Sequence, residues 1–397
     1  MRIAIFDGFR GFFLLFMMII HANVELHAIL GKLNHHYFGW VEDAQGFVFI
    51  SGFVVGLVYG NRLLKRGFAS CKSAIWRRIR TIYTHQATLI VIFLAAALLL
   101  AAFGLFPAIL APYRAEPVGF TTASLALISG SKHMGILPMY IWFMMLTPFI
   151  LEAFRRNYAG FVLALSALLW FLAQTGLIEV VVQTGELALA GLGHPIRLGI
   201  FFNVFGWQVL FVGGLYLGLH SAAGTLDLSF LKNRQWQLVF CLTLGAFFFL
   251  GIYDRVVFHE LLGHAFSEAV FAHTDRGNFS LIYPIAFIVD LFIVTWLVVA
   301  GEESRVRLFQ KMSAFVQWLF TRRFLVFLGQ HSLHVFSAHV LVVYVLAIVV
   351  EYYPPGPVWR EVLIVLTPIP LYLAAWGHAR LQRKTTAKAQ RVPASQS

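Results

Sequence analysis

The feature that most constrains this chain is a series of long, nearly uncharged apolar stretches along most of its length. About 17 to 25 apolar residues are enough for a helix to cross the hydrocarbon core of a bilayer, where the backbone must satisfy its own hydrogen bonds. The sequence therefore predicts an all-α fold, a polytopic transmembrane helical bundle. We expect about ten transmembrane helices, at residues 4–28, 42–61, 83–105, 134–153, 160–177, 204–220, 237–254, 281–300, 325–349 and 359–379.

The composition excludes a soluble globular protein. Of the 397 residues 59% are hydrophobic and only 12% are charged, whereas soluble domains carry about 25% charged residues. We predict one integral-membrane domain over residues 1–380, followed by a basic, disordered cytoplasmic tail over residues 381–397. Cys71 and Cys241 stand alone, so we expect neither a disulfide framework nor a cysteine zinc site.

The basic residues predict the orientation of the helices. With both termini cytoplasmic, 22 of the 30 Lys and Arg residues lie in cytoplasmic segments and six in outer loops. This asymmetry is the positive-inside pattern of membrane proteins. It explains the net charge of +12 through topology and anionic lipid, so no nucleic-acid partner is expected. Residues 107–133 and 178–203 are only mildly apolar and could be re-entrant or interfacial.

The first predicted span carries Asp7, Arg10, His21 and Glu25. Ionisable groups in mid-membrane cost about 2.5–3.5 kcal/mol each on insertion scales, so they are retained for a reason. At 3.6 residues per turn, Arg10 and His21 lie on one face, about 16 Å apart along the axis. Asp7 and Glu25 fall on the same stripe. The stripe is either an ion-pair ladder that fixes packing or a path between the two sides of the membrane.

Arg10 and His21, with ten residues between them, resemble the signature of the acyltransferase-three superfamily of integral-membrane acyl-CoA transferases. More closely, the chain resembles the OpgC family, named for the succinylation of osmoregulated periplasmic glucans. The matching segments follow one another over most of the chain. They are residues 7–11 (DGFRG), 38–60 (beginning FGWVEDAQGFVFISG), 136–140 (ILPMY), 203–208 (NVFGWQ) and 328–339 (LGQHSLHVFSAH).

The resemblance implies an acyl-CoA-dependent O-acyltransferase, a multi-pass protein of the bacterial inner (plasma) membrane. Its donor would be a cytoplasmic coenzyme A thioester, succinyl-CoA or acetyl-CoA, and its acceptor a periplasmic glucan or related glycan, without a metal. His21 would act as general base, with Asp7 and Glu25 in the catalytic group. Arg10 would anchor the coenzyme, because guanidinium groups bind phosphate in a fork geometry.

The same resemblance implies further contacts. It singles out His339, and we assign Ser51 and His331 to coenzyme binding together with it. The substrate-binding candidates are Glu42, Asp43, Asn203, Trp207 and Gln208. Among these, Asn203, Trp207 and Gln208, together with Ser51, could donate hydrogen bonds to the oxyanion of a tetrahedral intermediate.

One segment departs from the family pattern. Where we expect Ser-Asp-Ala-Ala-Glu, the chain has Val-Glu-Asp-Ala-Gln at residues 41–45, so Gln45 replaces a carboxylate. The acyl group and the acceptor therefore stay open, and an acetyltransferase acting on another cell-envelope glycan is an alternative. A transporter or flippase for a polar solute is a second alternative, although no inverted repeat is visible.

The remaining histidines do not predict a metal site. Residues 259–264 imitate a zinc-protease motif, but Gly263 stands where HExxH requires its second histidine. We expect His331, His334 and His339 to line a path across the membrane, to contact a coenzyme or to be ordinary capped polar groups, rather than to bind zinc. His35 and His36 lie in a predicted outer loop, where solvated side chains or contacts to an acceptor sugar are expected.

Overall fold

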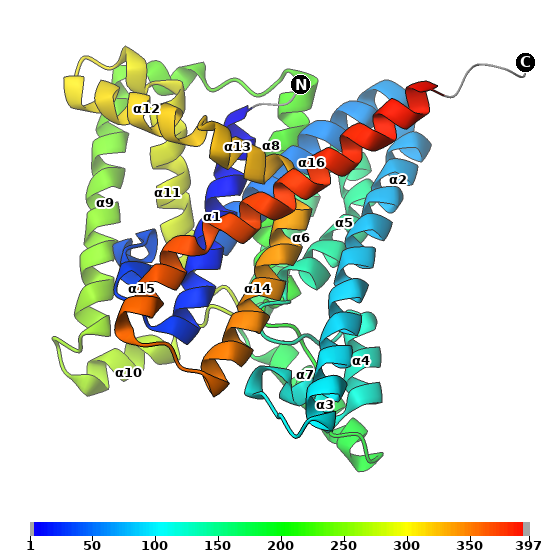
Figure 1. Cartoon of the computed structure of the whole chain (residues 1–397). Coiled ribbons are helices and arrows are strands. Elements are labelled where there is room, and N and C mark those ends of the chain that lie inside the picture. Colours follow the sequence, from blue (N-terminus) through cyan, green and yellow to red (C-terminus); the bar gives the residue numbers. More distant parts are fainter. Residues whose placement is uncertain (1–3, 392–397) are drawn as a thin grey trace, which may run out of the picture. The chain divides into compact units, whose positions relative to one another are not determined.

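The computed structural model of the protein describes residues 4–391 (Figure 1). Within that range every regular element is helical, and the only β-type pairing is an isolated bridge between Ser129 and Gly199. This confirms the predicted all-α fold class. The chain forms two compact units, the first from Met1–Leu33 and Trp318–Ser397 and the second from Asn34–Gln317.

The first unit joins the two ends of the chain around α1. Its helices are α1 (Ala4–Leu26), η1 (Leu30–Lys32), α13 (Arg323–Gln330), α14 (Ser332–Tyr352), α15 (Pro357–Leu366) and α16 (Pro368–Arg391). α1 packs against α13 and α14, and α16 packs along α14 (Figure 1). Residues that lie more than 300 positions apart in the sequence therefore become neighbours.

Glycines allow α1 and α13 to approach very closely. A Cβ atom added to Gly8 would lie 1.6 Å from the carbonyl oxygen of Phe320, three residues before α13, and one added to Gly11 would lie 1.9 Å from that of Leu325 on α13. Gly329 of α13 makes the reciprocal contact, since a Cβ atom added to it would lie 1.8 Å from the backbone carbonyl oxygen of Asp7. Small residues at such positions are typical of helix contacts in membranes. They fix the N-terminal half of α1 against α13.

The second unit contains the long helices α2 and α8, which pack on each other through glycines. Gly52 and Gly56 of α2 face Gly214 and Gly218 of α8, and an added Cβ at any of them would lie 2.1–2.3 Å from a backbone oxygen of the other helix. α9 and α11 lie side by side (Figure 1). The unit's elements are η2 (His35–Phe38), α2 (Asp43–Ala102), η3 (Ala108–Leu110), α3 (Ala111–Ala115), α4 (Pro117–Leu125), α5 (Ile136–Arg155), α6 (Ala159–Ala173), α7 (Leu177–Gly191), α8 (Val204–Ala223), η4 (Ser229–Lys232), α9 (Arg234–Phe258), α10 (His264–Ala272), α11 (Ile282–Val299), η5 (Gly301–Glu303) and all but the end of α12 (Arg307–Phe320).

α2 replaces two predicted spans, 42–61 and 83–105, by one helical run of 60 residues. A straight helix of that length would measure about 90 Å, roughly three times the hydrocarbon core of a bilayer. The run is broken at Gly67, whose φ of 75° belongs to the left-handed region that favours glycine. Across the break, the Arg62 guanidinium donates to the carbonyl of Ser70 at 3.1 Å. The break lets the two apolar halves take different directions.

Eight of the described helices are long and apolar enough to cross a membrane, and nine if the bent pair α6 and α7, which meet at 60°, forms one span. Residues 107–133 hold only short helices. The number of spans and the side on which the termini lie stay predictions. Of the predicted tail 381–397, residues up to Arg391 continue α16, and residues 392–397 lie outside the described range.

Candidate active site

The first unit brings two histidines from distant parts of the chain into contact. Nδ1 of His21 on α1 lies 2.8 Å from Nε2 of His339 on α14. The two rings are nearly parallel, with centroids 5.0 Å apart. His339 is fully buried, and the ring of Phe336 packs edge-on against it. A hydrogen bond in this position orients both imidazoles, and its direction follows from which of the two nitrogens carries the proton.

A second pair of residues joins the same two helices. The Arg10 guanidinium on α1 donates to the hydroxyl of Ser332, the first residue of α14. Ser332 and His339 are seven residues apart and so share one face of α14, just as Arg10 and His21 share one face of α1. The stripe predicted on the first helix therefore has a matching stripe on α14.

Asp7 lies beside Arg10, with 3.8 Å between the carboxylate and a guanidinium nitrogen. Both side chains are largely withdrawn from solvent, with 10% and 17% exposed. A buried charge is tolerated when it is paired, so Asp7 has a clear role in pairing with Arg10 and orienting it. Its predicted part in catalysis, and that of Glu25 near the end of α1, are untested and stay predictions.

The coenzyme-binding candidate His331 belongs to a histidine cluster that includes a residue the sequence did not single out. His331 is the N-cap residue of α14, and its Nδ1 lies 2.8 Å from Nδ1 of His378 on α16. The ring of His334 stacks on His378 with centroids 3.5 Å apart. The i, i+3 spacing of the first two histidines indicated a shared face, but nothing in the local sequence points to His378.

In the second unit, a loop at residues 275–278 collects several of the predicted substrate-binding residues. Arg276 forms an ion pair with Glu42, the N-cap residue of α2, at 3.1 Å. The indole of Trp207 donates to the carbonyl of Arg276 at 3.1 Å, and the Asn203 side-chain amide donates to Asn278 at 2.7 Å. Asn278 in turn donates to Glu179 and to Asp275. Sequence reasoning found three of these residues but missed the loop that connects them.

The side chains of Asn203, Trp207 and Gln208, predicted to donate hydrogen bonds to an oxyanion, donate hydrogen bonds to other residues of the protein in this structure. Trp207 is fully buried, and Gln208 donates to the carbonyl of Ser166 at 2.7 Å and accepts from its hydroxyl at 2.7 Å. Ser51 is buried on α2. The contacts of Trp207 and Gln208 give these two residues a structural role, and the oxyanion and coenzyme roles stay predictions.

Gln45, which replaces the expected carboxylate, has its own explanation. Its side-chain oxygen accepts from the backbone N–H of Glu42, completing a capping box at the start of α2. Its amide N–H groups donate to the carbonyls of Trp40 and Tyr283 at 3.3 and 3.4 Å. A carboxylate could not donate these hydrogen bonds. The amide therefore ties the start of α2 to α11.

Asp43 is buried at the first position of α2 and faces two histidines of η2. One carboxylate oxygen lies 3.1 Å from Nε2 of His35 and the other 3.3 Å from Nε2 of His36. Burial opposes the charged form of His36, but the hydrogen bond to Asp43 and the nearby carboxylates outweigh it and raise its pKa. Asp43 thus belongs to a compact cluster of possible ligands.

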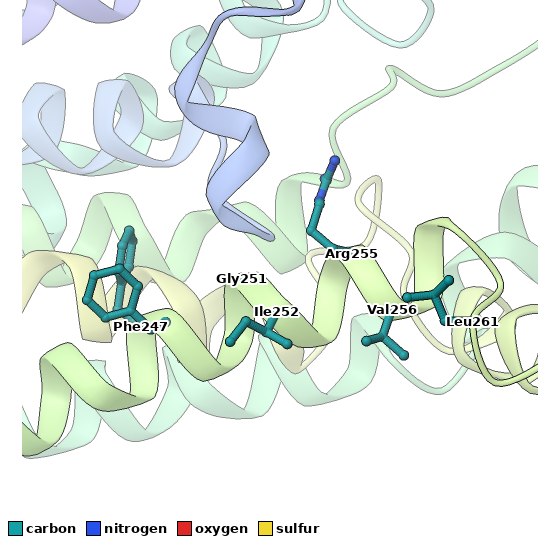
Figure 2. A pocket seen from close by; sticks show the side chains of 7 residues that line it. Phe247, Gly251, Ile252, Arg255, Val256 and Leu261 are labelled. Atoms are coloured by element: carbon teal, nitrogen blue, oxygen red, sulfur yellow. The ribbon is translucent and has the colours of Figure 1, made fainter.

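Figure 2 shows the residues that line a pocket beside α9, which does not have the character of an active site. Apart from Arg255 its lining is apolar or glycine: Phe247, Phe248, Gly251, Ile252, Val256 and Leu261. Arg255 pairs with the adjacent Asp254. The pocket offers no nucleophile or general base, so the candidate site is the histidine pair.

Together, the long apolar helices and the buried pairs of polar residues define an all-helical membrane protein with a candidate acid–base site. A family model described as OpgC protein matches residues 2–383. The protein belongs to the OpgC protein family, as the motifs predicted, and this family indicates a transferase with a glucan succinyltransferase-like function. No curated protein and no solved structure matches the chain.

Proposed function

We propose that the protein is an O-acyltransferase of the bacterial inner membrane, and that it moves a succinyl group from cytoplasmic succinyl-CoA to a hydroxyl of a periplasmic glucan. The observation that carries the proposal is the contact between Nδ1 of His21 and Nε2 of the buried His339. A histidine held by a second hydrogen-bonding group is the usual form of a general base in acyl transfer.

The chemistry requires a defined direction of this hydrogen bond. When Nδ1 of His21 carries the proton and donates to His339, Nε2 of His21 is left as a base. It takes the proton from the acceptor hydroxyl while the oxygen attacks the thioester carbonyl carbon. The tetrahedral intermediate then expels the coenzyme A thiolate, which receives that proton from His21. His339 holds the ring and stabilises the imidazolium that forms in between.

The donor would bind beside the Arg10 end of the α1 stripe. The guanidinium of Arg10 is held by Ser332 and Asp7. His331 directly precedes Ser332 in the sequence and contacts His378 of α16, on which the ring of His334 stacks. Cationic and hydrogen-bonding groups of this kind suit the phosphates of coenzyme A.

The test is acyl transfer by the purified, detergent-solubilised chain, with succinyl-CoA and acetyl-CoA as donors and a periplasmic glucan as acceptor. We expect transfer from succinyl-CoA, and its loss in His21→Ala with unchanged thermal stability. The matched control is His264→Ala, because His264 is exposed and pairs with Glu260 and Glu268 on the surface. It should retain full activity.

Full transfer by a folded His21→Ala variant would overturn the mechanism. Preference for acetyl-CoA would replace the succinyl assignment by an acetyl one. Uptake of a polar solute by proteoliposomes without any coenzyme A thioester, and no transfer with one, would favour transport along the charged stripe.

A further inference from the structure

The cluster of His35, His36 and Asp43 lies outside the proposed transfer site and has the composition of a metal site. Each residue can offer one ligand atom, and the three atoms lie within 4.8 Å of one another. Asp43 is only 3% exposed, and the two histidine side chains are 18% and 23% exposed. The three side chains therefore converge in a largely enclosed space.

The spacing of the ligand atoms suits a small transition-metal ion. Metal–nitrogen and metal–oxygen bonds to Zn²⁺ measure about 2.0–2.2 Å, so neighbouring ligands of a tetrahedral ion lie about 3.3 Å apart. Nε2 of His35 lies 3.1 Å from one carboxylate oxygen of Asp43 and Nε2 of His36 lies 3.3 Å from the other, and the three ligand atoms, one from each residue, all lie within 4.8 Å of one another. The ion would fit with small movements of the side chains.

The local backbone explains why the cluster is preformed. Asn34 caps η2 by accepting from the backbone N–H of His36 at 2.9 Å, which fixes the two adjacent histidines in a short helical turn. Asp43 is held at the start of α2 by the capping box of Glu42 and Gln45. Glu42 is itself paired with Arg276. The ligands thus stand on two short, hydrogen-bonded helix ends rather than on free loops.

We propose that His35, His36 and Asp43 bind one divalent transition-metal ion, Zn²⁺ or a similar ion. Two imidazoles and one carboxylate are ligands that such ions prefer, whereas Mg²⁺ and Ca²⁺ favour sites built wholly from oxygen. Three protein ligands leave a fourth position for water or for a hydroxyl group of a bound molecule. The proposal does not depend on the acyltransferase function.

The competing explanation is a metal-free cluster in which Asp43 simply accepts hydrogen bonds from both histidines. The experiment uses the full chain, without a histidine tag, purified in detergent and freed of metal with a chelator. Titration with Co²⁺ reports ligand number and geometry through its visible d–d absorption, and competition with a chelating dye gives the affinity for Zn²⁺. We expect one ion per chain and the intense bands of a tetrahedral site.

The variants are His35→Gln and His36→Gln, singly and together, because they keep size and polarity and leave Asp43 and the capping box intact. Each single change should weaken Zn²⁺ binding by at least about a hundredfold, since even outer-shell partners of metal ligands are worth 10- to 100-fold. His264→Gln is the matched control, because His264 also lies next to two carboxylates but on the surface. It should bind the ion as the unaltered chain does.

The absence of Co²⁺ bands and of bound Zn²⁺ in the unaltered chain would overturn the proposal in favour of the metal-free cluster. Unchanged stoichiometry and affinity in the double variant would also overturn it. Binding that disappears in His264→Gln would place the ion on α10 and equally contradict the assignment.

Discussion

His339 illustrates how one buried residue can govern the chemistry of another. If His21 donates from Nδ1, the acceptor Nε2 of His339 lies 2.8 Å away and stabilises the charge that His21 gains. His339→Phe preserves much of the volume beside Phe336 but removes the acceptor. We expect kcat to fall by about a hundredfold, the low end of general-base contributions, with the KM for acyl-CoA unchanged. Steady-state kinetics of transfer checks this.

His339→Gln is the conservative counterpart, because its amide oxygen can accept the same hydrogen bond. It should recover part of the lost kcat. A positioning role would be contradicted if both variants raised the KM for acyl-CoA and left kcat intact, since His339 would then contact the coenzyme itself.

His133 makes the stability of the second unit sensitive to pH. It lies in the turn before α5, and its burial together with the charges of Lys132 and Arg276 lowers its pKa from 6.5 to about 4. As pH falls below 6.5, the unfolded chain takes up a proton that the folded chain refuses, so the folded state loses stability until about pH 4. At pH 5 the loss amounts to roughly 2 kcal/mol.

His133→Asn should remove this dependence. Asparagine tolerates the left-handed conformation of His133, whose φ is 67°. The measurement is the thermal midpoint of the detergent-solubilised chain between pH 7 and pH 5. We expect the midpoint of the variant to fall less steeply than that of the unaltered chain. Parallel curves would show that His133 does not titrate in this way.

At the scale of elements, the first unit depends on the close approach of α1 and α13. Gly11→Ala adds one methyl group that would lie 1.9 Å from the backbone oxygen of Leu325, and backbone cannot move aside as a flexible side chain can. We expect a loss of about 1–3 kcal/mol or more, as for other overpacked interiors, and a shift of Arg10 relative to Ser332. The thermal unfolding midpoint of the variant should be lower, and added acyl-CoA should raise it by less than in the unaltered chain.

Gly377→Ala is the matched control within the same unit. Gly377 lies on α16 with nothing within 4 Å of its missing Cβ, so alanine should be neutral or slightly stabilising through its higher helix propensity. Equal effects of the two substitutions would contradict the packing argument.

The elements differ in how far their sequence predicts them. Apolar length placed most of the helices, but the basic segment after residue 61 suggested a loop where α2 continues, because Lys and Arg are good helix formers. Only Gly67 breaks that run. The stripe of Arg10 and His21 followed from helical spacing alone. Their partners did not, since Ser332 and His339 lie 322 and 318 residues away and helical periodicity carries no information about such pairings.

For the whole molecule, the distribution of charge makes a prediction about sidedness. Twenty-two of the 30 basic residues fall in segments predicted to be cytoplasmic, and such a bias sets orientation during insertion. Single cysteines can test this after Cys71 and Cys241 are replaced by alanine. Arg66→Cys reports a predicted cytoplasmic segment and Arg197→Cys a predicted outer one, and both positions are exposed. A membrane-impermeant maleimide applied to spheroplasts should label only Arg197→Cys, and both variants after permeabilisation.

The same labelling bears directly on the proposed reaction. Arg10 lies near the start of α1 and His21 about 16 Å further along its axis. Acyl-CoA is made in the cytoplasm, so the Arg10 end can anchor it only if the start of α1 faces inward. Labelling of Arg66→Cys in spheroplasts would show that the orientation is the reverse of the predicted one. Arg10 would then face the periplasm, out of reach of the donor, and the charged stripe would need a different explanation from acyl transfer.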